Sequence, residues 1–175
     1  LPIQMLIQDF IYDFSQLGIP YDTVDKEFLI KPKKWDTKGL SKFMKVMGIT
    51  SSVVDVLAFL IFWFILGYNS IDKQAFFQTA WFVMCLISEL LIIVNVRTAK
   101  TSLIKSHPSK ILSTLIALSI VLTVVAPIIL TKVTSFHFVI LPAIYYFYIL
   151  LLIILYFIIV TVIKKIYIKN NNEWL

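Results

Sequence analysis

The sequence predicts an all-α integral membrane protein, a bundle of about five transmembrane helices whose C-terminus lies in the cytoplasm. Of its 175 residues 59% are hydrophobic and 15% are charged, whereas soluble domains average about 45–50% apolar and about 25% charged residues. The charged residues gather in blocks between long uncharged runs. Aromatic residues make up 15% of the chain, which argues against disorder. A single cysteine, Cys85, excludes a disulfide framework.

Four stretches are apolar and long enough to cross a membrane, since a bilayer core of about 30 Å takes roughly 20 residues. They cover about residues 49–68, 76–96, 111–130 and 142–163. A fifth stretch, residues 1–20, is long enough to cross but carries several polar side chains. We expect it to be the first transmembrane helix. The remainder of the region 49–175 after the last span is expected to be a cytoplasmic tail.

The segment 21–48 is predicted to be a cytoplasmic loop that contains a short interfacial helix capped by Thr37. Apolar residues recur there at helical spacing, opposite basic residues: Leu40, Phe43, Met44 and Met47 against Lys38, Lys42 and Lys45. A basic amphipathic helix beside a span usually lies in the membrane interface. The alternative is a simple connector whose lysines face phospholipid.

The basic residues predict the orientation. Fourteen of them fall in the segment 20–48, the segment 97–110 and the tail, and the two intervening loops carry only Lys73 and Lys132. Because loops rich in Lys and Arg face the cytoplasm, the N-terminus is expected outside and the C-terminus inside. This placement fits a lipid bilayer as partner, and it does not fit nucleic acid, which would need a basic surface stripe.

Acidic side chains within the spans are the candidate site, because a carboxylate at mid-membrane costs about 2.5–3.5 kcal/mol and is functional by default. Asp9 and Asp13 are spaced i, i+4 and share a helical face, which Gln16 continues. Carboxylate and amide oxygens are the ligands that hard cations such as Mg²⁺ prefer. The row therefore predicts a cation site. The alternative is an interfacial helix with its polar side in water.

Two further acids lie in the later spans. Glu89 could complete the cation site, or it could pair with Arg97 or carry a proton in a neutral hydrogen bond. Asp55 follows Ser52 in the S-x-x-D pattern of a helix start, so we expect it to be a structural cap.

The run LPIQMLIQDFIYDFSQ, with the following GIPYDTVD, resembles the sixth transmembrane helix and its cytoplasmic exit in bacterial magnesium-transporting P-type ATPases. The resemblance continues through Pro32 and Trp35, Phe43-Met44, Gly48–Asp55, Trp81–Val83, Ser88-Glu89 and Arg97-Thr98. The last two spans match in hydrophobicity alone. Spans six to ten of such a pump would also end in the cytoplasm.

The resemblance implies a role for each acid. The ion-ligating Asn/Asp-x-x-x-Asp pair of the family falls on Asp9 and Asp13, and the first position departs from the Asn usual in magnesium pumps. Glu89 lies near the glutamate that related calcium pumps carry in the eighth span. Asp22 and Asp25 fall in the loop that contacts the phosphorylation domain, where they would be coupling or loop-stabilising residues.

For the whole protein the resemblance implies ATP-driven Mg²⁺ transport in a bacterial plasma membrane, with Mg²⁺ as the transported ion. ATP would act only through domains absent from this sequence, so this segment alone is not expected to hydrolyse it. The expected partners are the remaining domains and spans of the pump. The alternative is a freestanding membrane protein, either a gradient-driven carrier or an assembly partner of a channel.

Overall fold

The computed structural model describes residues 1–30, 36–100, 105–171 and 174. Within these residues it contains five α-helices, in agreement with the predicted all-α fold: α1 Pro2–Gln16, α2 Thr37–Leu60, α3 Gln74–Val96, α4 Lys110–Leu130 and α5 Ala143–Asn171. A π-helical turn, Ile61–Ile65, extends α2. Short 3₁₀ turns occupy Ile19–Tyr21, Lys26–Leu29, Ile71–Lys73 and Thr134–Phe136.

Four of these helical segments are long and apolar enough to cross a membrane: Thr37–Ile65, Ile71–Val96, Lys110–Leu130 and Ala143–Asn171. They correspond to the four long spans that the sequence predicts. The last helix is longer than expected, since it continues through the predicted tail to Asn171. The helix α1 has 15 residues, which gives it a length of about 22 Å at 1.5 Å per residue.

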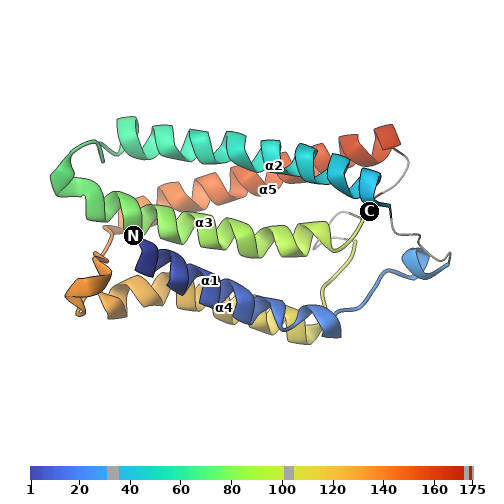
Figure 1. Ribbon diagram of the computed structural model, residues 1–175, viewed down its shortest axis with the longest axis horizontal. Helices are drawn as coiled ribbons and strands as arrows, with labels where there is room; N and C mark the ends of the chain where they lie inside the picture. Colours follow the sequence, from blue (N-terminus) through green and yellow to red (C-terminus); the bar gives the residue numbers. More distant parts are fainter. Residues whose placement is uncertain (31–35, 101–104, 172–173, 175) are drawn as a thin grey trace.

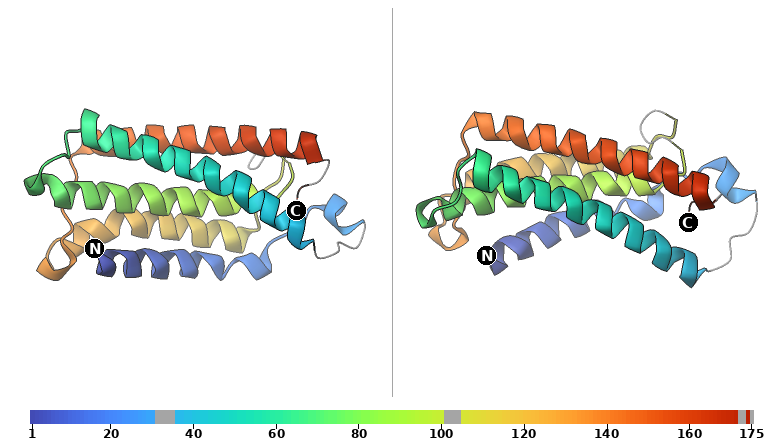
Figure 2. Two further views of the ribbon diagram at one scale, coloured as in Figure 1. Left: turned by 45° about the horizontal axis from the view of Figure 1, so that its top comes forward. Right: turned by 90° about the horizontal axis from the view of Figure 1, so that it is seen from above.

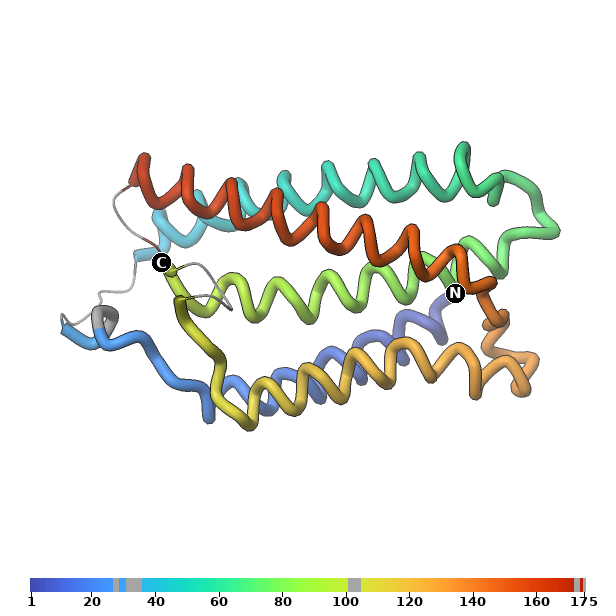
Figure 3. Tube along the Cα trace, turned by 180° about the vertical axis from the view of Figure 1, so that it is seen from behind, coloured from blue at the N-terminus to red at the C-terminus, as the bar shows by residue number. Residues whose placement is uncertain are grey.

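The helices run side by side in a bundle with α3 at its centre (Figures 1 and 3). α3 packs against α1, α4 and α5, and α2 packs against α5. Ala80, Val83, Met84, Leu86 and Leu90 of α3 are fully buried. The left view of Figure 2 shows α1 along α4 on one side of α3 and α2 beside α5 on the other.

The bundle has two distinct ends. Residues 17–30, 97–100 and 105–109 and the last turns of α5 lie together at one end, which we call the lysine-rich end (Figure 1). The N-terminus and the connections 66–73 and 131–142 lie at the opposite end. The structure thus gathers at one end the described segments that the charge count groups together.

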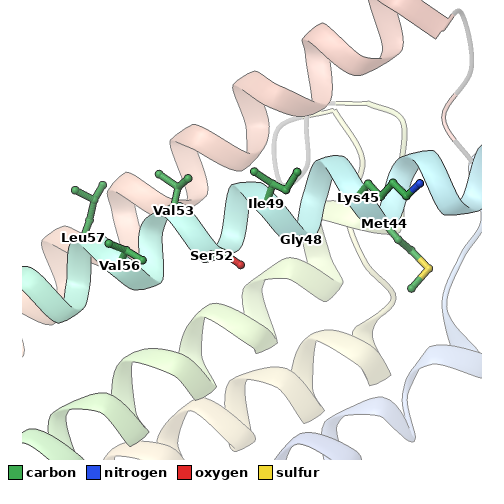
Figure 4. A pocket seen from close by; sticks show the side chains of 8 residues that line it. All are labelled: Met44, Lys45, Gly48, Ile49, Ser52, Val53, Val56 and Leu57. Carbon is green, nitrogen blue, oxygen red and sulfur yellow. The ribbon is translucent and has the colours of Figure 1, made fainter.

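The structure differs from the prediction in the segment 21–48. The helix expected near Thr37 is not a separate element, because α2 runs unbroken across residue 48 into the next span. Its N-cap is Asp36 rather than Thr37, and the Asp36 carboxylate accepts a 3.0 Å hydrogen bond from the Lys38 amide. Figure 4 follows the side chains from Met44 to Leu57 along this continuous helix, where they line an apolar groove of about 570 Å³.

Candidate cation site

The helix α1 buries one narrow face against α4 and α3. Gln4, Ile11 and Ser15 are buried on this face, and Ser119 of α4 donates a 3.4 Å hydrogen bond to the Ile11 carbonyl. Just beyond the helix, a Cβ added to Gly18 would lie 2.9 Å from the Leu112 Cα. Glycine is therefore the residue that lets the end of α1 approach α4 this closely.

The predicted ligands Asp9 and Asp13 lie on the other side of α1, where both are exposed, and Gln16 is half-buried. Large apolar side chains share this face: Met5 is 66% exposed and Phe10 is 68% exposed. The two carboxylates stand on one helical face, as the i, i+4 spacing predicts, and they point away from the packed side of α1.

A second row of polar side chains on α1 faces the neighbouring elements. The Gln4 amide donates a 2.9 Å hydrogen bond to the Phe136 carbonyl in the connection between α4 and α5. Gln8 Nε2 donates to both carboxylate oxygens of Glu89, at 3.0 and 3.1 Å. The polar row of α1 that contacts the rest of the bundle is therefore the row of Gln4 and Gln8. It lies next to the row of the two aspartates on the helix surface.

A cavity of about 360 Å³ opens between α1, α2 and α3, and Glu89 lies on its wall. Gln4, Gln8 and Gln78 add polar groups to this wall, and so does Asp55 of α2. The expected capping role of Asp55 is wrong, because α2 begins at Thr37 and Asp55 lies in its second half. The S-x-x-D pattern is misleading here because nothing interrupts the helix before Ser52.

The predicted ligand set is divided between two places. Glu89 is bound to Gln8 beside the cavity, and Asp9 and Asp13 occupy the exposed face of α1. Within the described part of the chain, no three His, Cys, Asp or Glu side chains come close enough together to hold a metal ion. Asp9, Asp13 and Glu89 therefore do not form a complete site by themselves in these residues.

Arg97, the C-cap of α3, is paired with Asp22 instead of Glu89, so the alternative of a Glu89–Arg97 pair is wrong. Arg97 Nε lies 2.5 Å from Asp22 Oδ2. Its two other nitrogens donate to the Thr23 carbonyl at 2.8 Å and to Ser106 Oγ at 3.0 Å. Asp22 Oδ1 also accepts a 2.7 Å hydrogen bond from the amide of Ser109, the N-cap of α4.

Asp25 completes this group, which we call the Asp22–Asp25 cluster: Asp22, Asp25, Arg97, Thr98 and Ser106. Asp25 accepts hydrogen bonds from Thr98 and, at 2.8 Å, from Ser106. Partial burial alone would raise the pKa of the Asp25 carboxyl, but these hydrogen bonds and the charges of Lys100 and Arg97 lower the pKa below its usual value. The cluster ties the segment that follows α1 to the connection between α3 and α4.

Sequence reasoning missed two contacts that shape this region. The Gln8–Glu89 and Arg97–Asp22 contacts join residues more than 70 positions apart, and no local pattern marks such pairs. A signal for Gln8 was present in the sequence, because it belongs to the polar row beside Asp9 and Asp13.

Most of the chain is similar to known proteins. The family model described as "Cation transporting ATPase, C-terminus" matches residues 1–166. Over 107 residues, 61% of this chain, the sequence is 44% identical to a magnesium-transporting ATPase, P-type 1, of Salmonella typhimurium strain LT2. It is 40% identical over 109 residues, 62% of this chain, to the Escherichia coli K12 protein of the same name. The matched parts make up 12% of each of these longer relatives.

Proposed function

This chain belongs to the family of cation-transporting ATPase C-terminal domains, and from that premise we propose that it forms part of the ion path of an ATP-driven Mg²⁺ pump. The observation that carries the proposal is the position of Asp9 and Asp13 on one exposed face of α1. The choice of Mg²⁺ as the transported ion rests on the relatives, which are named magnesium-transporting ATPases. The same relatives are bacterial, so we place the pump in the plasma membrane.

The composition of the exposed face of α1 supports this role. Carboxylates alternate there with apolar side chains such as Met5, Leu6 and Phe10, a combination that suits neither open water nor lipid. Further spans of the pump would cover the apolar groups and add ligands to the carboxylates. Proteins usually hold Mg²⁺ through one or two carboxylates, and the ion keeps several of its waters. Asp9 and Asp13 would therefore supply enough carboxylate ligands for one ion.

We place α1 across the membrane as a fifth span, with the lysine-rich end in the cytoplasm. The excess of Lys and Arg at this end supports the orientation, and α1 lies along α4 (Figure 1). Glu89 would act as a further ligand on the packed side of α1, where Gln8 orients it beside the cavity. The family match favours a pump over a freestanding carrier.

The Asp22–Asp25 cluster supplies a route for coupling. ATP would be hydrolysed by domains outside this chain, and their movement must reach the ion ligands through the membrane helices. Because Arg97 and Ser109 hold Asp22, the segment after α1 moves together with the ends of α3 and α4. A push on this segment would therefore be transmitted to α1 and its carboxylates.

The test is Asp13→Asn in the complete pump, measured as Mg²⁺-stimulated ATP hydrolysis. Loss of an outer partner of a metal site costs about 10–100-fold, so loss of a direct ligand is expected to lower activity by about 100-fold or more. The matched control is Asp72→Asn, because Asp72 is exposed at the opposite end of the bundle. A normally assembled Asp13→Asn pump with unchanged stimulation would contradict the proposal.

A further inference from the structure

Trp174 is buried at the lysine-rich end, with only 6% of its surface exposed. Its ring packs edge-to-face on Phe43 of α2, with centroids 4.9 Å apart, and on Tyr167 of α5, at 5.9 Å. The indole Nε1 donates a 2.9 Å hydrogen bond to the Val96 carbonyl at the end of α3. One side chain thus joins three helices.

Lys164 of α5 reaches the same place from inside the bundle. It is 2% exposed, and its ammonium donates a 2.6 Å hydrogen bond to the Asn95 carbonyl. The ammonium also lies 5.2 Å from the centroid of the Trp174 ring, within cation–π range. A charge this deeply buried is stable only where such groups compensate it.

Asn95 and Val96 are the last two residues of α3, and carbonyls in the last turn of a helix have no partner within it. Lys164 and Trp174 satisfy both carbonyls from outside. A third hydrogen bond holds this turn, because the Asn95 side-chain amide donates to Thr161 Oγ1 at 2.9 Å. The final turn of α3 is therefore fixed to α5 by side chains and not only by packing.

The residue that follows this turn is Arg97, which holds Asp22 in the Asp22–Asp25 cluster. We propose that Trp174 and Lys164 are positioning residues of the pump: by fixing the last turn of α3 they keep Arg97 on Asp22, and the turnover rate depends on that link. The effect on turnover rests on the proposed function, whereas the structural link does not.

The link predicts an effect on turnover more than on cation affinity. Trp174 and Lys164 contact the end of α3, and the Asp22–Asp25 cluster lies after the end of α1. Asp9 and Asp13 lie further back within α1. Loosening Arg97 would therefore weaken the transmission of movement and leave the carboxylate ligands in place.

The structural arm measures amide hydrogen exchange in the complete pump in lipid nanodiscs. In Trp174→Ala, exchange should rise by roughly fivefold or more at residues 94–98 and also at residues 22–25, to which Trp174 makes no hydrogen bond or ring contact in the described part of the chain. Trp174→Phe keeps the ring on Phe43 and Tyr167 and loses the donor to Val96, so exchange should rise at both segments, but by less than in Trp174→Ala. The matched control, Trp63→Ala, removes a partly exposed tryptophan in the π-helical turn that extends α2, and should leave both segments unchanged.

Faster exchange at 94–98 with unchanged exchange at 22–25 would overturn the proposal, and so would the same increase in Trp63→Ala. If Trp174→Ala does not assemble, Lys164→Met decides, because it removes the ammonium and keeps a long apolar side chain. Lys164→Met should raise exchange at both segments, and an increase confined to residues 94–98 would again overturn the link.

The functional arm separates this proposal from the cation site. Trp174→Ala should lower kcat for ATP hydrolysis by about fivefold and leave the half-saturating Mg²⁺ concentration within about twofold, and Trp174→Phe should restore only part of the kcat, because it lacks the donor to Val96. A change in Mg²⁺ affinity with unchanged kcat would contradict the positioning role. If the chain proved not to act in Mg²⁺ transport, the exchange result would still stand or fall independently.

Discussion

Gly18 controls how closely the segment after α1 approaches α4. A Cβ at this position would meet the Leu112 backbone at 2.9 Å and Leu115 Cδ1 at 3.1 Å. A backbone atom cannot move aside as a flexible side chain can, so the conflict must be relieved by shifting a helix. Glycine at this position therefore permits close packing between the segment after α1 and α4.

We therefore expect Gly18→Ala to destabilise the protein by about 1–3 kcal/mol, the usual cost of overpacking. The measurement is the shift in the thermal unfolding midpoint of the purified pump. Gly48→Ala is the matched control, because a Cβ at Gly48 would meet nothing within 4 Å. Inside a helix that change is expected to stabilise by about 0.5–1 kcal/mol. Equal shifts for the two variants would contradict the close packing at Gly18.

At the scale of the element, α2 is one continuous helix that joins a basic amphipathic half to an apolar half. Lys38, Lys42 and Lys45 lie in its first part, and the apolar groove continues along the same helix past Gly48. A break in the helix near residue 48 would let the first part of α2 lie flat in the membrane interface. The continuous helix instead carries the lysines straight out from the span.

Gly48→Pro distinguishes these two arrangements. A proline inside a continuous helix removes a hydrogen bond and clashes with the preceding turn, so it should cost about 3 kcal/mol or more of unfolding free energy. Thr37→Pro is the control, because Thr37 is the first residue of α2, a position where proline is well tolerated. If thermal unfolding of Gly48→Pro matched that of Thr37→Pro, α2 would have a break at residue 48.

The sequence predicts the long elements well and their contacts poorly. Uncharged runs predict the later spans because a bilayer requires a minimum apolar length. The continuity of α2 was missed because the change from amphipathic to apolar sequence at Gly48 looks like a boundary. The positions of Asp55 beside Glu89 and of Trp174 on Val96 depend on packing between distant segments, which periodicity does not encode.

At the scale of the whole molecule, the two ends of the bundle differ in charge, and the helices differ in how far their neighbours cover them. Along the bundle, the Asp22–Asp25 cluster and the Trp174 contacts are concentrated at the lysine-rich end (Figure 1). Across the bundle, α3 is enclosed by its neighbours, and α1 leaves the face of Asp9 and Asp13 uncovered. We therefore propose that the enclosed helices support the bundle and that the uncovered face of α1 binds the ion.

The most direct test of that assignment is equilibrium binding of Mg²⁺ to the complete pump without ATP, measured by titration calorimetry. The Asp9→Asn/Asp13→Asn double variant should bind one Mg²⁺ fewer than the unmodified pump, because each change removes a charged ligand from the same ion. Asp72→Asn should bind the full number. If the double variant bound Mg²⁺ with unchanged stoichiometry and affinity, the exposed face of α1 would not be the ion site.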